Sequence, residues 1–145
     1  MTTPDYETDF YAWTQAQAAH LRAMHWDALD RDNVAEEIES LGNEQRHAVE
    51  SHLRILLAHL LKWQYQPKRR SRSWQTSILN ARTEIERRLA RNLSLQHVWP
   101  EMLAWAYPKA QQLAAIETAL SRQKFAANCP WQQDQILDED FLPEA

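Results

Sequence analysis

The sequence contains a single glycine, Gly42, and this scarcity excludes several kinds of protein. β-Sandwiches and β-barrels use glycine in their tight turns and bulges, so neither fold is expected. The glycine-rich loops that hold phosphate groups in Walker and dinucleotide-binding motifs are missing as well. The chain is therefore expected to be neither an all-β protein nor one that binds nucleotides through such a loop.

Cysteine and long apolar runs are also scarce. Cys129 is the only cysteine, so neither an intrachain disulfide nor a CxxC zinc site can form. The first ten residues carry three acids and no base, which is unlike a signal peptide. The longest apolar run, residues 55–61, is far shorter than the roughly 20 residues that span a bilayer. We expect a cytoplasmic protein that does not enter a membrane.

The overall composition and length are those expected of a soluble globular protein. Hydrophobic residues make up 44% and charged residues 25% of the chain, and its 145 residues suit one domain spanning 1–145. The net charge of −4 is unevenly distributed: residues 1–61 carry −7, residues 62–91 carry +7 and residues 92–145 carry −4. The acidic first part can complement the basic middle when the chain folds back on itself.

Apolar residues recur at helical spacing along most of the chain. The pattern predicts an all-α fold, an antiparallel bundle of about four main helices with short connections. A carboxy-terminal tail containing Pro130 and several acids is expected to dock on the bundle as an irregular strap. The predicted helices cover residues 8–24, 33–66, 73–93 and 95–121, and the tail covers residues 128–145.

The second predicted helix has the strongest signals. Asn33, followed three residues later by Glu36, fits a capping box at its start, and Pro67 ends it. Gly42 is expected to bend this helix or to divide it into two. Its apolar positions alternate by four and three residues, as in a helix packed on other helices. They are Val34, Ile38, Leu41, Val49, Leu53, Leu56, Leu60 and Trp63.

The ends of the other helices follow from caps and prolines. Thr8 is the expected N-cap of the first helix, and Ser71 or Ser73 that of the third. Ser94 is expected to open the fourth helix. Pro108 is expected to kink that helix or to begin a new segment within it.

Three long stretches of the chain resemble a known family. They are DFYAWTQAQAAHLRAMHWDALDRDNVAEEIESLG, LRILLAHLLKWQYQPKRRSRSW and the closing ILDEDFLPE. The sequence resembles the bacterial family called domain of unknown function 29, found in cyanobacteria and proteobacteria, over almost the whole chain. The resemblance implies a small, all-α, bundle-like bacterial protein. It implies no activity and no catalytic residue.

A few histidines and one glutamate could form a metal site. Glu44 and His47 have the Glu-x-x-His spacing of di-iron carboxylate bundles, but such sites need a second pair, and the chain has none. A mononuclear site could still use His47, His52, His59 and Glu36. The alternative is that these are polar or half-buried histidines hydrogen-bonded within the bundle. We therefore expect no metal and no other cofactor.

A basic cluster between the second and third predicted helices is the main candidate for binding a partner. It consists of Lys68, Arg69, Arg70 and Arg72, with Trp74 nearby. Cations with an adjacent aromatic suit nucleic acid, although the chain as a whole is acidic. The alternatives are a protein partner and pairing within the chain. The basic residues that follow are Arg82, Arg87, Arg88 and Arg91, and the last three are spaced to pair with Glu36, Glu37 and Glu39.

Seven tryptophans are many for a chain of this length, and most are expected to lie in the core. Any that stay exposed would mark a binding surface. Cys129 and Ser73 lack the neighbours of a catalytic nucleophile, and no other catalytic residue is identified. The sequence thus favours a protein without catalytic activity that binds another protein or itself. The alternatives are a nucleic-acid-binding accessory protein that uses the basic region 68–91 and, after it, a metal-dependent enzyme.

Overall fold

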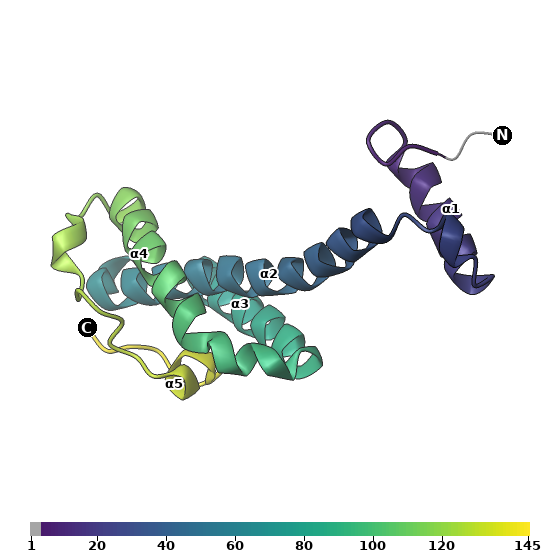
Figure 1. Ribbon diagram of the computed structural model, residues 1–145. Helices are drawn as coiled ribbons and strands as arrows, with labels where there is room; N and C mark the ends of the chain where they lie inside the picture. The colour runs from purple at the N-terminus through teal and green to yellow at the C-terminus, as the bar shows by residue number, and fades with distance from the viewer. Residues whose placement is uncertain (1–3) are drawn as a thin grey trace. The chain divides into compact units, whose positions relative to one another are not determined.

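The computed structural model describes residues 4–145; the first three residues of the expected domain lie outside the described part. The chain is all-α, and no residue from 4 to 145 lies in a strand. In this described part, five α-helices are joined by short 3₁₀ segments (Figure 1). They are α1 (Phe10–Arg22), α2 (Arg31–Tyr65), α3 (Arg72–Arg91), α4 (Trp99–Thr118) and α5 (Gln133–Leu137). The expected helical, bundle-like fold with four main helices is confirmed.

The chain divides into two compact units within α2. The amino-terminal unit ends at Glu44, and the carboxy-terminal unit runs from Gln45 to Ala145. The single domain expected over residues 1–145 stays a prediction.

The carboxy-terminal unit has an apolar core built from α2, α3 and α4 with the tail. The apolar residues at helical spacing in the second half of α2 are fully buried, and residues of α3 and α4 join them in one cluster. Members of this cluster include Val49, Leu53, Leu56, Leu60, Ile78, Ile85, Leu89, Met102, Ala106, Phe125, Trp131 and Ile136. Packing of an amphipathic face, rather than helix propensity, therefore stabilises these helices.

The helix α2 is continuous from Arg31 to Tyr65, so Gly42 does not divide it. Asn33 lies inside the helix, and the expected capping box with Glu36 is wrong. The side-chain amide of Asn33 donates instead to the carboxylate of Asp30, the residue before the helix, at 2.9 Å. The helix ends before Pro67, as predicted, since the residue preceding a proline disfavours helix and proline has no N–H to donate.

Two other helix starts are decided by side-chain caps. Asp9, not Thr8, caps α1, because its carboxylate accepts from the backbone N–H of Ala12 at 3.0 Å. Of the two serines considered for α3, Ser71 is the cap, and its hydroxyl accepts from the N–H of Trp74 at 3.2 Å.

The start of α4 differs from the prediction because of a proline. Residues 93–98 form the 3₁₀ segment η3 (Leu93–Val98), and α4 begins only at Trp99. An α-helix beginning at Leu95 would place Pro100 beyond its first turn, whereas proline is tolerated within the first turn. Pro108 lies inside α4 and begins no new segment.

Within the carboxy-terminal unit, the tail packs on the helices and contributes Trp131 and Ile136 to the core. It includes the short helix α5, whose start is held by a reciprocal capping box between Gln132 and Gln135 (yellow in Figure 1). The rest of the tail is irregular, as expected for a strap.

Candidate functional site

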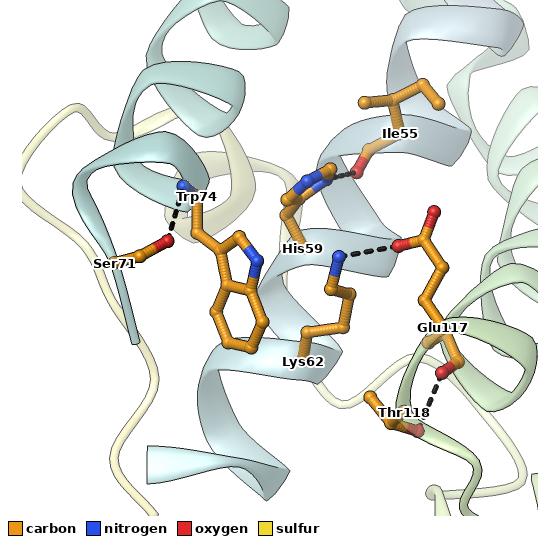
Figure 2. A network of polar contacts seen from close by, with 8 residues as sticks. Ile55, His59, Lys62, Ser71, Trp74, Glu117 and Thr118 are labelled. Atoms are coloured by element: carbon orange, nitrogen blue, oxygen red, sulfur yellow. Dashed lines mark hydrogen bonds and ion pairs between the residues drawn. The ribbon is translucent and has the colours of Figure 1, made fainter. Parts of the chain in front are cut away.

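A polar cavity of about 360 Å³ lies where the end of α2, the start of α3 and the end of α4 meet. Figure 2 shows its central contacts. The lining residues come from all three helices and from the connection between α2 and α3. They are His59, Lys62, Gln66, Arg69, Ser73, Trp74, Glu117 and Thr118. Three residues singled out in the sequence, His59, Arg69 and Trp74, are thus brought to one place.

Lys62 is the central residue of this cavity, and its side chain is almost completely buried. Its ammonium nitrogen lies 2.5 Å from Oε2 of Glu117 and 4.8 Å from the ring centroid of Trp74 (Figure 2). A buried ammonium is tolerated when a carboxylate and an aromatic face replace its lost hydration. One face of the Trp74 ring is therefore in contact with the Lys62 ammonium group within the protein.

His59 lies beside this pair and is half-buried. Its Nδ1 is 2.9 Å from the carbonyl oxygen of Ile55, one turn earlier in α2, so Nδ1–H is assigned as the donor. Burial of the ring lowers the pKa of His59, and the neighbouring charge of Lys62 lowers it further. The imidazole is therefore neutral near pH 7.

The other metal candidates are not gathered around His59. His47 and Glu44 are exposed and His52 is half-buried. Within residues 4–145, no three side chains of histidine, cysteine, aspartate or glutamate converge as ligands of a metal ion would.

The basic cluster between α2 and α3 is divided by the fold. Lys68, Arg69 and Arg72 are exposed. Arg70 turns inward, where its Nε–H donates to the carbonyl of Trp63 at 2.8 Å and its guanidinium lies 4.9 Å from the Trp63 ring centroid. Three cations of the cluster thus remain available to a partner.

Two of the arginines late in α3, Arg87 and Arg88, have partners other than those expected. Arg87 and Arg88 both approach Oε2 of Glu84 on their own helix, at 2.9 and 3.8 Å. Arg88 also donates to the side-chain oxygen of Gln45 at 3.0 Å. Glu37, one of their expected partners, accepts a hydrogen bond from the hydroxyl of Tyr6.

Arg82 is the residue whose role the sequence analysis missed. It is 2% exposed, its Nε–H donates to the carbonyl of Ile136 at 2.7 Å, and its Nη2 donates to that of Phe141 at 2.8 Å. Arg82 therefore holds the tail and is not available to a phosphate. The sequence does indicate that Arg82 is buried, because Arg82 lies four residues after Ile78 and three before Ile85, on the apolar face of α3.

Cys129 has the environment of a structural thiol. It is half-buried, its Sγ–H donates to the carbonyl of Trp131 at 3.6 Å, and burial raises the pKa of the thiol. A thiol with a raised pKa stays protonated near pH 7 and is a poor nucleophile.

The amino-terminal unit is organised around one polar network. The indole N–H of Trp13 and the amide of Asn33 both donate to Oδ2 of Asp30, at 3.0 and 2.9 Å. The backbone N–H of Asp30 donates to the side-chain oxygen of Gln17 at 2.7 Å. The bonds from Asn33 and then Trp13 stabilise the carboxylate and lower the pKa of Asp30.

The same unit leaves most of its large apolar side chains exposed. Of its described residues, 4–44, only Trp13 and Gln17 are buried. Its large apolar side chains that are between 41% and 75% exposed are Phe10, Tyr11, Leu21, Met24, Trp26, Ile38 and Leu41. A cavity of about 380 Å³ adjoins two of them and is lined by residues 24–28.

The two units carry opposite charge. The amino-terminal unit has ten acidic and two basic residues, and the carboxy-terminal unit has ten acidic and fourteen basic residues. The net charges are therefore −8 and +4, so the exposed apolar surface of the amino-terminal unit lies on a strongly acidic part of the chain.

No helix among residues 4–145 has an apolar stretch long enough to cross a membrane. No curated protein and no solved structure matches the chain. A family model described as domain of unknown function DUF29 matches residues 6–142, nearly the whole chain. The sequence resemblance is thereby confirmed, and the chain belongs to the family of the domain of unknown function DUF29.

Proposed function

We propose that this protein is non-catalytic and acts by binding another protein through its amino-terminal unit. The observation that carries the proposal is the contrast within residues 4–44 between two buried residues and seven large exposed apolar side chains. Met24 and Trp26 line one surface cavity, and contiguous exposed apolar surface commonly marks an interaction site. Trp26, 60% exposed, is of the residue type most enriched among binding hot spots.

The free energy of apolar burial supports protein binding through the amino-terminal unit. Burying one large apolar side chain is worth about 1.5–3 kcal/mol, so several of these residues together could supply the affinity of a stable complex. A unit this small builds little core of its own and gains stability from a partner that covers it.

The test is capture of partners by the full-length protein in lysate of cells that normally express it. The variant carries Met24→Ser and Trp26→Ser, both at exposed positions of the amino-terminal unit. The matched control carries Ile116→Ser, an exposed apolar residue of the carboxy-terminal unit. We expect the wild type and the control to retain a stoichiometric protein partner and the variant to lose it.

Two results would count against this proposal. One is a wild-type protein that captures no partner and remains a monomer by light scattering. The other is a partner that the wild type and the Met24/Trp26 variant retain equally.

Nucleic acid is the second candidate, and the exposure of Lys68 and Arg69 on the connection between α2 and α3 and of Arg72 at the start of α3 favours it. Three phosphate contacts predict that the logarithm of the binding constant falls with the logarithm of salt with a slope of about −2 to −3. The triple alanine variant of these residues tests it and leaves Arg70, which holds the carbonyl of Trp63, in place. Equal affinity of variant and wild type for DNA and RNA would end this candidate.

A further inference from the structure

The first half of α2 carries an apolar stripe that nothing in the amino-terminal unit covers. The α2 stripe consists of Ala35, Ile38, Leu41 and Gly42, all exposed. Ile38 lies three residues after Ala35, and Leu41 and Gly42 lie three and four residues after Ile38, so the four residues form one face of the helix. Ile38 and Leu41 are each 62% exposed and provide most of the apolar area.

The small members of the stripe allow another backbone to approach closely. A Cβ atom built on Gly42 would meet no other atom within 4 Å, so the glycine is not required by any contact within the fold. Glycine in a helix interior costs about 1 kcal/mol relative to alanine. A glycine without an internal reason, one position after Leu41, is suited to contact with an outside helix.

The charges beside the stripe decide what kind of helix can pack on it. Glu37 lies four residues before Leu41 and Glu44 three residues after it, so both flank the stripe on the same side. Glu39 lies three residues before Gly42, on the other side. The next cation along α2, Arg46, faces Glu50 at 3.9 Å.

A second copy of the same stripe is a poor occupant. When two such helices pair antiparallel, the flanking positions of one face the corresponding positions of the other. The glutamates at 37 and 44 would then face glutamates, and like charges across a helix pair are destabilising. The net charge of −8 on the unit adds a general repulsion.

We propose that the α2 stripe binds an amphipathic helix of another protein that carries lysine or arginine beside its apolar face. This inference rests on the proposed function and names the partner's chemistry. Ile38 and Leu41 insert between apolar residues of the partner helix, and Glu37, Glu39 and Glu44 pair with its cations. Recognition of an amphipathic helix through residues at three- and four-residue spacing is a recurring mode of protein binding.

The probe is a labelled helical peptide of about three heptads with leucine at a and d and lysine at e and g. Its affinity for the full-length protein is measured by fluorescence anisotropy at low and moderate salt. One control peptide has glutamate in place of lysine, and another has the same composition in scrambled order. We expect the lysine peptide alone to bind saturably, with an affinity that falls as salt rises.

Variants of the exposed positions assign the site without disturbing a buried contact. Ile38→Gln combined with Leu41→Gln should weaken binding at least about tenfold, since both anchors are removed. Glu39→Gln combined with Glu44→Gln should weaken it about threefold and flatten its salt dependence. Ile116→Gln, the control in the carboxy-terminal unit, should bind as the wild type does.

Each of the following results would overturn the inference: equal binding of the glutamate or scrambled peptide, unchanged affinity of the Ile38/Leu41 variant, or no binding of the lysine peptide. A wild-type dimer that the Ile38/Leu41 changes convert to a monomer would assign the stripe to a second copy and overturn it too. The proposed function would survive these outcomes if capture of a protein still depended on Met24 and Trp26.

Discussion

The indole N–H of Trp13 donates to the Asp30 carboxylate at 3.0 Å, and this bond links α1 to the residue that precedes α2. Asn33 donates to the same carboxylate oxygen. Because the amino-terminal unit has only two buried residues, its order depends strongly on this network.

The amino-terminal unit is expected to loosen in acid because of Asp30. Its pKa in the folded protein is lowered below the usual 3.8, so the stabilisation is present above that value and is lost as the pH falls through the folded pKa. The protection of residues 10–44 against hydrogen exchange, relative to the intrinsic rate at each pH, should fall below about pH 4. Asp30→Ala should show fast exchange already at pH 7, and exchange there as slow as in the wild type would contradict the role of the carboxylate.

Loss of Arg82 should release the tail. Arg82→Met leaves the carbonyls of Ile136 and Phe141 without their donor, which should lower the free energy of unfolding by about 2–5 kcal/mol. Limited proteolysis should then cut first within residues 128–145. Arg87→Met, at an exposed arginine paired with Glu84, is the control and should change stability by less than about 1 kcal/mol. Equal proteolysis of the two variants would contradict the assignment.

The pair of Lys62 and Glu117 should respond asymmetrically to mutation. Glu117→Ala leaves a buried ammonium without its carboxylate and should cost about 1–3 kcal/mol, less than for a fully buried pair because Glu117 is partly exposed. Lys62→Met keeps an apolar stem on Trp74 and should change stability by no more than about 1 kcal/mol. Denaturant unfolding of both single variants and the double variant measures the coupling. A double variant less stable than Glu117→Ala alone would refute this account.

Gly42→Ala should stabilise α2. The position lies in a helix interior with open space around it, so alanine should add about 0.5–1 kcal/mol, measured as a higher midpoint of thermal unfolding. If the α2 stripe binds a closely packed helix, the same change should lower the affinity for the lysine peptide. A lower unfolding midpoint would show that the glycine has a structural role within the fold.

Met24 and Ala119 both have left-handed backbone geometry, so one can serve as the control for the other. Met24, at φ 59°, follows α1, and Ala119, at φ 60°, follows α4. Glycine at either position should stabilise the protein by about 1 kcal/mol, because it adopts this geometry without steric cost. Only Met24→Gly should weaken partner capture, since it also removes an exposed apolar side chain. Equal capture by both variants would exclude Met24 from the interface.

The helices could be predicted from the sequence because each has a one-dimensional signal. The spacing of Leu53, Leu56 and Leu60 indicates a helix with one apolar face, and Pro67 indicates where it ends. Helix ends were predicted less well, since several residues near each end can act as a cap. The cap of α1 is Asp9 rather than Thr8, and α4 begins at Trp99, just before Pro100, rather than at Leu95.

The site residues could be predicted only in part, for a different reason. His59, Arg69 and Trp74 were chosen by residue type, and the fold places them around one cavity. Lys62 and Glu117 were not identified, and Arg82 was grouped with the basic residues that could bind nucleic acid, because the roles of all three depend on partners 54 to 59 residues away along the chain. No local pattern identifies such a partner.

By itself the sequence determined that the chain is helical and which residues lie on the apolar face of each helix, because both properties follow from local spacing. Only the tertiary structure decided which apolar residues are covered. Ile38 and Leu56 belong to the same four-and-three pattern in one helix, yet Ile38 is 62% exposed and Leu56 is fully buried. The difference arises because burial depends on the side chains that distant segments bring to each position, and spacing within a helix does not encode that.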